Sequence, residues 1–387
     1  MSKSKDETLL LHLGKDKHYK SANPSIVKAS SLIFDSIEEL HTIEKNHDDV
    51  NKSNNHYGRH GTRTNIELEN ILKSLEQSDY VQLCSSGLSA IVLVLMSICK
   101  QGDEIIYSDS SYEPVKSSLK MLKEFGVKSF AYNPNDIDSI KKLITANTKL
   151  IYVENPGSYS FEFQDLNKVL SIAKKHKITS AIDNTWATAL YFKPIPFGFD
   201  ISICSATKYL SGHSDFMMGT VAYNKNLRKK ISKTARSLGN HVSAEDAYLC
   251  FRGLRTLSIR LQRHHENALK VSKFLLKHKK VLSVLYPHSS VSKTYKNWKK
   301  NYTGASGLMG VVLKNTTSTK IKKAINQSKL FNIGYSWGGF ESMALPGHLG
   351  DREFKSEYSD NNLIRLHIGL EHIADILEDL KKILAVL

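Results

Sequence analysis

The sequence predicts an α/β fold built around a mostly parallel sheet, and two observations support that prediction. Between residues 66 and 204, short apolar runs of strand length alternate with longer amphipathic runs of helix length. This alternation is typical of parallel strands that are joined by helices. In addition, polar residues directly follow several of the apolar runs, and α/β sheets bind ligands at the carboxyl ends of their strands.

The chain length predicts more than one domain. A chain of 387 residues exceeds what one simple core usually organises, so two or three domains are expected. Residues 1–58 are rich in Ser, Asn, His and Lys and contain one strand-like run at 31–34. We expect this segment to form an N-terminal arm that packs on another subunit. A large domain is then expected over residues 59–254 and a smaller α+β domain over residues 255–387.

The elements of these domains follow from hydrophobic periodicity. Strands are expected at 80–84, 104–107, 150–154, 180–183 and 201–204, and helices at 66–76, 88–99, 113–125 and 167–175. An amphipathic pattern over 244–276 predicts one long helix that links the two domains. The chain is expected to end in a helix at 372–386.

The composition indicates a soluble globular protein, with 41% hydrophobic and 24% charged residues. The net charge is +16, but most of the basic residues are lysines, and several of them fall in adjacent pairs on the polar faces of expected helices, such as Lys141-Lys142 and Lys174-Lys175. A nucleic-acid-binding protein would more typically show arginine-rich stretches or a recognisable motif. We therefore interpret the charge as surface charge and expect no nucleic acid partner.

Other classes are also disfavoured by the sequence. The four cysteines are scattered, without a Cys-x-x-Cys pair: Cys84, Cys99, Cys204 and Cys250. The histidines do not pair with them at ligand spacing, so no metal site is expected. The N-terminal residues lack the apolar run of a signal peptide, and the longest apolar stretch, 90–99, is too short to span a membrane. We expect a cytoplasmic protein with no membrane partner.

The most informative stretch is 202–219, where Lys208 follows an apolar strand and is flanked by hydroxyl residues and glycines. An enzyme that uses pyridoxal phosphate (PLP) needs such a lysine. Its amine bonds to the cofactor aldehyde, and the neighbouring hydroxyl and backbone N–H groups hold the phosphate. The alternative is a solvated lysine in a polar loop, which the short motif alone would favour.

A second strand upstream ends in Asp183. Strand ends meet in one crevice of an α/β sheet, so Asp183 and Lys208 can lie together. PLP requires a carboxylate beside its pyridine nitrogen, because the protonated ring accepts electrons from a carbanion. The alternative is a turn or helix-cap aspartate, since Asn-Thr follows it. The spacing to Lys208 favours the cofactor role.

A series of motifs extends the pattern from about residue 30 to the C-terminus. In chain order they are Tyr57-Gly-Arg-His-Gly-Thr, Ser85-Ser-Gly, Tyr112-Glu-Pro, Glu154-Asn-Pro-Gly-Ser, Ile182-Asp-Asn-Thr-Trp, Ser205-Ala-Thr-Lys-Tyr, Gly212-His-Ser-Asp, Arg252-Gly-Leu-Arg-Thr-Leu, Tyr335-Ser-Trp-Gly-Gly and Leu363-Ile-Arg-Leu-His-Ile-Gly-Leu-Glu. In content and order the sequence resembles the PLP enzymes of cysteine and methionine metabolism. So many ordered matches make chance agreement negligible.

This resemblance implies the fold called PLP fold type I, with a mostly parallel central sheet in the large domain, an N-terminal arm and a smaller α+β C-terminal domain. It implies PLP as the cofactor, bonded to Lys208, with Asp183 at the ring nitrogen. The phosphate ligands that it implies are Ser205 and Thr207, and together with them Ser86, Gly87 and Leu88, which lie between a strand and a helix, are expected to bind the phosphate. A glycine at a helix N-terminus also suits an anion on physical grounds, although an ordinary strand-to-helix turn would be equally compatible.

The resemblance further implies a site shared between subunits. Tyr57 and Arg59 match residues that reach the cofactor phosphate of the neighbouring subunit, and Tyr57 also lies near the substrate. The active unit would then be a homo-oligomer, at least a dimer and expected to be a tetramer of two such dimers. Without the resemblance, a surface ion pair would be the favoured interpretation of Arg59.

Tyr112 precedes Pro114, which can begin a helix. The resemblance implies that the Tyr112 ring stacks on the cofactor and that its hydroxyl lies near the substrate amine, so Tyr112 joins Lys208 as a candidate catalytic residue. We expect nearby cations to lower the pKa of this phenol, so that it can take a proton. The alternative is an ordinary core or surface tyrosine.

Arg365 lies in an apolar strand of the C-terminal domain. A half-buried guanidinium needs an anion, and the α-carboxylate of an amino acid matches its planar fork. A structural ion pair is the alternative.

Three motifs resemble those of family members that cleave the Cβ–S bond of L-cystathionine, rather than those that act at Cγ. They are Tyr57-Gly-Arg, Asn155-Pro-Gly-Ser and Tyr335-Ser-Trp. The resemblance implies that substrate binding uses Arg365, Ser336, Trp337, Asn155 and Tyr57. Asn155 departs from the serine or threonine found in many of these members.

The expected substrate is therefore a small amino-acid thioether. The expected reaction gives homocysteine, pyruvate and ammonia, as in methionine biosynthesis, with β-elimination from other cysteine S-conjugates as a side activity. Three alternatives remain open. They are γ-elimination or γ-replacement on the same scaffold, racemisation of an amino acid such as alanine with Tyr112 as the acid, and nucleic-acid binding by the basic surface.

Overall fold

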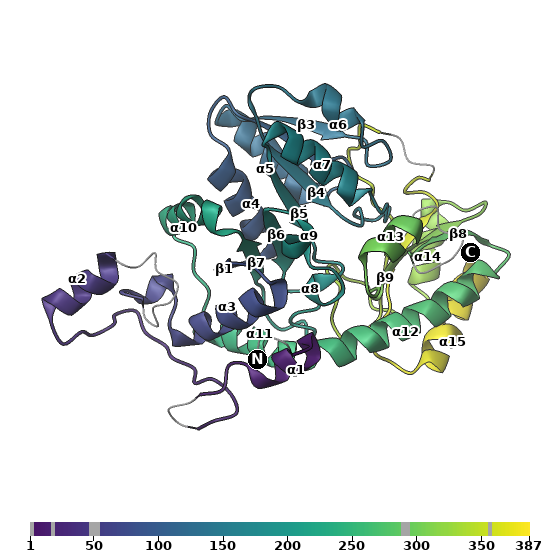
Figure 1. Ribbon diagram of the computed structural model, residues 1–387. Coiled ribbons are helices and arrows are strands. Elements are labelled where there is room, and N and C mark those ends of the chain that lie inside the picture. The colour runs from purple at the N-terminus through teal and green to yellow at the C-terminus, as the bar shows by residue number, and fades with distance from the viewer. Residues whose placement is uncertain (1–3, 17–19, 46–54, 288–294, 355–357) are drawn as a thin grey trace.

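The computed structural model describes residues 4–16, 20–45, 55–287, 295–354 and 358–387. Figure 1 shows a large sheet enclosed by helices, a smaller sheet beside it, and an N-terminal segment that extends away from the large sheet. Within the described ranges, no helix is both long and apolar enough to cross a membrane.

The large sheet has seven strands in the order β1-β7-β6-β5-β4-β2-β3. Their bounds are Tyr80–Cys84 (β1), Glu104–Ser108 (β2), Lys128–Tyr132 (β3), Thr148–Glu154 (β4), Thr179–Asp183 (β5), Ile201–Ser205 (β6) and Gly219–Tyr223 (β7). Strands β2 to β6 pair in parallel, and β7 is antiparallel to both of its neighbours. The predicted mostly parallel sheet is confirmed. Helices cover both faces of such a sheet, which explains why its strands have nearly continuous apolar sequences.

The helices around this sheet are α3 (Arg63–Glu76), α4 (Gly87–Ile98), α5 (Glu113–Glu124), α6 (Ser139–Leu143), α7 (Leu166–His176), α8 (Thr188–Tyr191), α9 (Pro194–Phe197) and α10 (Arg228–Ser237). Every helix predicted for this region is present. Helix α3 begins earlier than residue 66 because Thr62 caps it, with the Thr62 N donating to Asn65 Oδ1 at 2.8 Å.

The long helix predicted at 244–276 consists of two helices, α11 (Ala244–Arg255) and α12 (Leu257–Leu276). They meet at Thr256, whose φ of −111° and ψ of 7° lie outside the helical range. The Thr256 hydroxyl accepts a hydrogen bond from Arg260 Nε at 3.1 Å. The amphipathic pattern continues through this point, so periodicity alone does not reveal the break.

Helix α12 leads to the smaller sheet, in which every pair of strands is antiparallel (Figure 1). Its order is β10-β11-β9-β8. The elements of this region are β8 (Val281–Leu285), α13 (Tyr295–Asn301), β9 (Leu308–Leu313), α14 (Ser318–Ile325), β10 (Met343–Pro346), β11 (Leu363–His367) and α15 (Ile373–Val386). The predicted C-terminal helix is confirmed.

Other parts differ from the expectations. The strand predicted at 31–34 is wrong, because only Ser31 forms an isolated bridge, to Tyr57. The N-terminal segment contains α1 (Asp6–His12), α2 (Ile37–Lys45) and a short 3-10 helix, η1 (Gly58–His60), while residues 46–54 of the expected arm lie outside the described residues. The sequence does not predict strands β3 and β7, because β3 begins with the polar residues Lys128 and Ser129 and β7 begins with Gly219.

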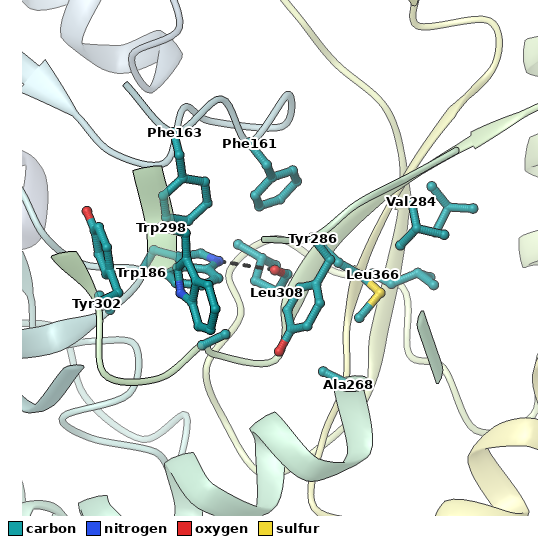
Figure 2. Close-up of a cluster of buried hydrophobic side chains, with 14 of the residues drawn as sticks. Phe161, Phe163, Trp186, Ala268, Val284, Tyr286, Trp298, Tyr302, Leu308 and Leu366 are labelled. Carbon is teal, nitrogen blue, oxygen red and sulfur yellow. Dashed lines mark hydrogen bonds between the residues drawn. The ribbon is translucent and has the colours of Figure 1, made fainter. Parts of the chain in front are cut away.

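The largest hydrophobic cluster joins the two sheets and anchors the connection that follows β4 (Figure 2). Phe163 from this connection lies edge-on to Trp186 and Tyr302, with ring centres 5.5 and 5.3 Å apart. Trp186 Nε1 donates to Leu308 O at 3.1 Å, which links the large sheet to β9. Contacts with both sheets therefore hold the connection that follows β4 in place.

Candidate active site

Acidic and hydroxyl side chains gather at the carboxyl ends of three adjacent strands. Glu154 and Asp183 end β4 and β5 and are register partners in the parallel ladder, and Ser205 ends β6. The turn after β6 carries Lys208, and a loop before β10 brings Ser336 to it. This arrangement agrees with the usual position of ligand sites in α/β sheets.

Lys208 is not the solvated loop lysine that its short motif alone would favour. Its Nζ donates to Ser336 Oγ at 2.6 Å and lies 5.4 Å from the centre of the Trp337 ring. Burial, together with the nearby Arg365 guanidinium, lowers the pKa of Lys208 from 10.5 to about 8. Near neutral pH, more of this amine is therefore unprotonated and able to act as a nucleophile or base.

Asp183 is 8% exposed and also fills the turn role that its sequence suggests. Its Oδ1 accepts a hydrogen bond from Thr185 N at 2.9 Å, and Thr185 Oγ1 accepts one from Ser205 N at 2.8 Å. Burial raises the pKa of Asp183, while the Thr185 hydrogen bonds and the Lys208 charge oppose that rise. A carboxylate buried in this way is stabilised by a positively charged partner in the crevice.

Glu154 is a carboxylate of this crevice that sequence reasoning missed as a site residue. Its Oε2 accepts a hydrogen bond from Tyr112 N at 2.6 Å. Burial and the charge of Asp183 raise the pKa of Glu154 well above its usual value. Its place at the end of a predicted strand, like that of Asp183, is the signal that points to it.

The start of α4 lies against the end of β6. Ser86 caps α4, because its Oγ accepts from Ser89 N at 3.0 Å and its N donates to Ser89 Oγ at 2.8 Å. A Cβ on Gly87 would lie 2.6 Å from Ser205 Oγ, so glycine permits this close approach. A helix N-terminus beside a hydroxyl is a physical match for a phosphate.

The other two expected phosphate ligands flank this feature. Leu88 is 39% exposed at the first turn of α4. Thr207 lies in the turn before Lys208, where its Oγ1 donates to Met218 O at 3.2 Å and accepts from Met218 N at 3.0 Å. These bonds hold the turn that carries the lysine.

Tyr112 precedes α5 with its side chain 46% exposed. The expectation that cations lower the pKa of its phenol is wrong. Partial burial of the phenol and the Glu154 carboxylate raise that pKa, and the Arg365 guanidinium only partly opposes them. The hydrogen bond from Tyr112 N to Glu154 Oε2 holds this carboxylate beside Tyr112. The two residues are 42 positions apart, so the sequence does not reveal the contact.

Arg365 lies in the middle of β11 and is half-buried. Its Nη2 donates to Ser336 O at 3.3 Å, and its Cζ lies 4.7 Å from the centre of the Tyr159 ring. Among the described residues, no carboxylate forms an ion pair with Arg365. The alternative of a structural ion pair therefore has no partner in that part of the chain, and the guanidinium retains donors for an anion.

Asn155 is buried and has both ends of its amide engaged. Its Nδ2 donates to Tyr302 Oη at 2.6 Å, and its Oδ1 accepts from Gln164 N at 2.8 Å. These bonds fix the connection after β4. We therefore do not expect Asn155 to contact the substrate.

Tyr57 and Arg59 are both exposed, with Arg59 Cζ 5.5 Å from the Tyr57 ring centre. Gly58 between them donates its N–H to Ser30 O at 2.8 Å. Within the described part of the chain, no hydrogen bond or ion pair joins either residue to Lys208 or Asp183.

The residues of the crevice fit the expected cofactor. Lys208 has a lowered pKa, Asp183 is a buried carboxylate, and the lack of a Cβ on Gly87 lets the start of α4 approach Ser205 closely. No group of three or more His, Cys, Asp or Glu side chains among the described residues could hold a metal ion.

Comparisons with known proteins agree with this chemistry. The sequence profile of the family described as "Cys/Met metabolism PLP-dependent enzyme" matches residues 7–385. The chain is 37% identical to a cystathionine β-lyase of Escherichia coli, covering 98% of each sequence. It is 34% identical to an L-alanine/L-glutamate racemase of Wolbachia pipientis, covering 98% of this chain and 97% of the relative.

A solved structure matches as well. The cystathionine γ-lyase of Lactobacillus plantarum, determined in complex with L-serine, superposes with a TM-score of 0.89 at 27% identity, covering 99% of each chain. This match confirms the predicted fold type I.

Proposed function

The chain belongs to the family of Cys/Met metabolism PLP-dependent enzymes, and from that premise we propose that it is a cystathionine β-lyase. It would cleave the Cβ–S bond of L-cystathionine to give homocysteine, pyruvate and ammonia. Several relatives bear that name, including the one from Escherichia coli described above.

One observation carries the proposal: Lys208, with its lowered pKa, lies close enough to Asp183 and Arg365 for their charges to act on it. Asp183 is a buried carboxylate at a strand end, and Arg365 has no carboxylate partner among the described residues. Removing a proton from the Cα of an amino acid requires a base, an electron acceptor and a grip on the carboxylate. These three side chains, with the cofactor, meet those requirements.

Bound PLP supplies the electron sink for the negative charge that develops at Cα. Lys208 would hold it covalently, and Asp183 would keep its ring nitrogen protonated. The start of α4 at Ser86, Gly87 and Leu88, together with Ser205 and Thr207, would hold the phosphate. Tyr112 would cover the ring with its own aromatic face.

The chain's own residues then direct the proton transfers. Arg365 binds the α-carboxylate with its planar fork and so fixes the orientation of the Cα–H bond. Lys208, once free of the cofactor, takes the proton from Cα as its neutral amine. The Cβ–S bond breaks, and Lys208 delivers a proton to the leaving sulfur. We assign that delivery to Lys208 rather than Tyr112, because the raised pKa of Tyr112 keeps its proton bound.

The products follow from this balance. Sulfur leaves as the thiol of homocysteine, and the remaining three-carbon enamine reacts with water to give pyruvate and ammonia. Ser336 and Trp337, which contact the Lys208 amine, would line the substrate side of the crevice. The reaction belongs to methionine biosynthesis.

We propose that the chain has three parts and that it assembles into an oligomer. We propose an N-terminal arm over residues 1–58, a PLP-binding domain over 59–254 and a C-terminal domain over 255–387. We also propose a homotetramer built from two dimers, with Tyr57 and Arg59 of each chain serving its neighbour. The exposure of both residues supports that role, and the whole assembly is proposed to be cytoplasmic.

Two other activities use the same groups. The match to a γ-lyase structure favours γ-elimination as the second candidate. The racemase relative favours racemisation of alanine, which needs only reprotonation of Cα from the opposite face, as a side activity.

A product assay tests these functions together. The purified protein is incubated separately with L-cystathionine, L-cystine and L-alanine. Pyruvate and homocysteine from L-cystathionine support the β-lyase. Release of 2-oxobutyrate instead would assign the γ-lyase reaction, and D-alanine would reveal the racemase activity. A protein that forms none of these products contradicts the proposal.

A further inference from the structure

Tyr159, in the connection between β4 and α7, packs against the guanidinium of Arg365. The Arg365 Cζ lies 4.7 Å from the centre of the Tyr159 ring, and the ring is half-buried. Burial raises the pKa of Tyr159, so the phenol stays neutral. The face of a neutral aromatic ring carries partial negative charge and attracts a guanidinium.

The backbone at Tyr159 has an unfavourable conformation. Its φ is 62°, and Phe161 has a φ of 55°. Residues with a side chain rarely adopt this left-handed region, and such geometry persists only where the surroundings impose it. Placing the Tyr159 ring against Arg365 therefore depends on contacts elsewhere in the protein.

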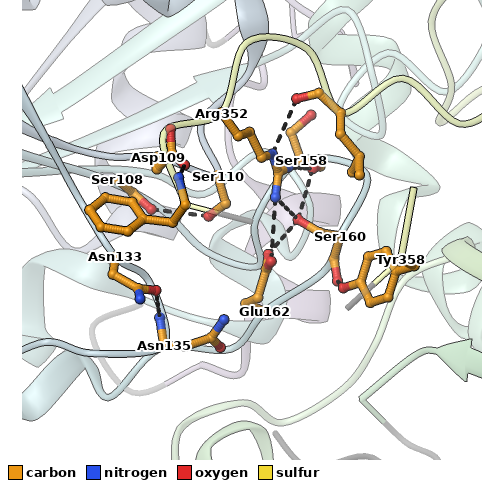
Figure 3. A network of polar contacts seen from close by, with 12 residues as sticks. Ser108, Asp109, Ser110, Asn133, Asn135, Ser158, Ser160, Glu162, Arg352 and Tyr358 are labelled. Atoms are coloured by element: carbon orange, nitrogen blue, oxygen red, sulfur yellow. Dashed lines mark hydrogen bonds and ion pairs between the residues drawn. The ribbon is translucent and has the colours of Figure 1, made fainter. Parts of the chain in front are cut away.

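Arg352, in the connection between β10 and β11, supplies contacts on both sides of Tyr159 (Figure 3). Its Nη2 donates to Ser158 O at 2.6 Å, and its Nη1 donates to Ser160 Oγ at 2.6 Å. It also pairs with Glu162 Oε1 at 3.4 Å, where both side chains are nearly buried. Arg352, from the small-sheet region, thus holds the residues before and after Tyr159 in place.

A residue after β2, Ser110, and a hydrogen bond within the segment also hold it in place. Ser158 N donates to Ser110 O at 2.7 Å, and Phe161 N donates to Gly157 O at 2.9 Å. The Phe161 side chain is only 5% exposed in the hydrophobic cluster of Figure 2. Tyr159 is therefore held between a buried anchor and the Arg352 contacts.

A contact with the face of an aromatic ring suits an arginine that must bind a carboxylate. A guanidinium that lies flat on a ring keeps the N–H donors along its edges free for other partners. Ser336 O accepts one of these donors at 3.3 Å. The remaining edge donors stay available for a planar, two-oxygen anion.

We propose that Tyr159 is a positioning residue for substrate binding: its ring, held in place by Arg352, fixes the plane of the Arg365 guanidinium so that its edge meets the α-carboxylate of the amino-acid substrate. This inference rests on the proposed role of Arg365. It predicts that loss of the ring weakens binding of the carboxylate specifically, while the rest of the substrate binds as before.

The test compares two probes on the holoenzyme, L-alanine and L-alaninamide, which differ in whether the carboxylate charge is present. Their dissociation constants are measured from the change in cofactor absorbance. Tyr159→Leu removes the ring and should weaken L-alanine roughly 3- to 30-fold while leaving L-alaninamide within about twofold. Tyr159→Phe keeps the ring and should restore L-alanine binding to within about twofold of the unaltered enzyme.

Tyr295→Leu is a matched control, because the Tyr295 ring also stacks on a cation, Lys299, but on α13. It should change neither dissociation constant. In an Arg365→Ala background, Tyr159→Leu should add less than about twofold, since residues that act through one another are not additive. The melting temperature of each variant identifies any general loss of structure.

Three results would overturn the inference. One is an unchanged L-alanine constant in Tyr159→Leu, another is equal weakening of both probes, and the third is additivity with Arg365→Ala. The proposed reaction is judged separately, by whether the unaltered enzyme forms pyruvate from L-cystathionine. The binding test gives the same readout whichever reaction the enzyme catalyses.

Discussion

Lys208 and Ser336 are joined by a hydrogen bond of 2.6 Å between the large-sheet and small-sheet parts of the molecule. The loop that carries Ser336 approaches the lysine closely, because a Cβ on Gly338 would lie 2.9 Å from the Lys208 carbonyl carbon. Ser336 itself has a φ of 83°, a conformation that the surroundings must impose. The position of the amine therefore depends on both sheets being in place.

The first prediction concerns the covalent link to the cofactor. The purified protein should be yellow, and reduction with borohydride should fix the cofactor to the peptide that contains Lys208. The low pKa of this amine favours its reaction over that of other lysines. Peptide mapping by mass spectrometry measures the result. A label on any other lysine would show that Lys208 is not the attachment site.

The second prediction follows from the same pKa in the cofactor-free protein. Below pH 8, Lys208 is protonated in the folded and unfolded chain, so its shift from 10.5 to about 8 lowers the free energy of unfolding. Replacing it by Lys208→Met should raise that free energy by about 1–3 kcal/mol at pH 7. Between pH 8 and 10.5 the unfolded chain binds more protons, so the unaltered protein becomes more stable and the gain shrinks.

Denaturant unfolding at pH 7 and pH 10 measures this difference. Lys225→Met, at an exposed position, is the matched control and should have little effect at either pH. A gain from Lys208→Met that stays constant across this range would contradict the lowered pKa.

The sequence predicts which strand ends form the site better than it predicts the contacts and pKa values of the side chains there. Strand ends follow from periodicity, so the proximity of Asp183 and Lys208, whose charges interact, could be expected from their positions alone. The contact between Tyr159 and Arg365 could not, because it joins the β4 connection to β11 and requires a positive φ at a residue that is not glycine. The raised pKa of Tyr112 likewise depends on a distant carboxylate, that of Glu154.

The third prediction concerns the shared site. Arg59→Ala and Lys208→Ala should each inactivate the enzyme, because one removes a proposed phosphate ligand and the other the base. Mixing and exchanging the two chains should restore about a quarter of the unaltered activity, since half of the dimers are hybrids and each hybrid has one intact site. Pyruvate release from L-cystathionine is the measurement. Exchanged chains that stay inactive would rule out a site formed by two subunits.

The fourth prediction separates substrate binding from folding at Arg365. If Arg365 binds the α-carboxylate, Arg365→Ala should keep the yellow cofactor and the melting temperature. Its kcat/KM on L-cystathionine should fall by about 30- to 1000-fold, the equivalent of a charge-assisted pair worth about 2–4 kcal/mol. Arg365→Lys should recover only part of this loss, because an ammonium cannot reproduce the planar fork.

A structural role for Arg365 predicts a different combination of results. Loss of a buried ion pair would lower the melting temperature and the cofactor content together with the activity. No carboxylate among the described residues pairs with Arg365, so we expect the first combination. Cofactor absorbance, melting temperature and kcat/KM measured on one preparation distinguish the two. A stable, yellow Arg365→Ala enzyme with nearly unchanged kcat/KM would remove Arg365 from the site, because a carboxylate ligand must contribute to transition-state binding.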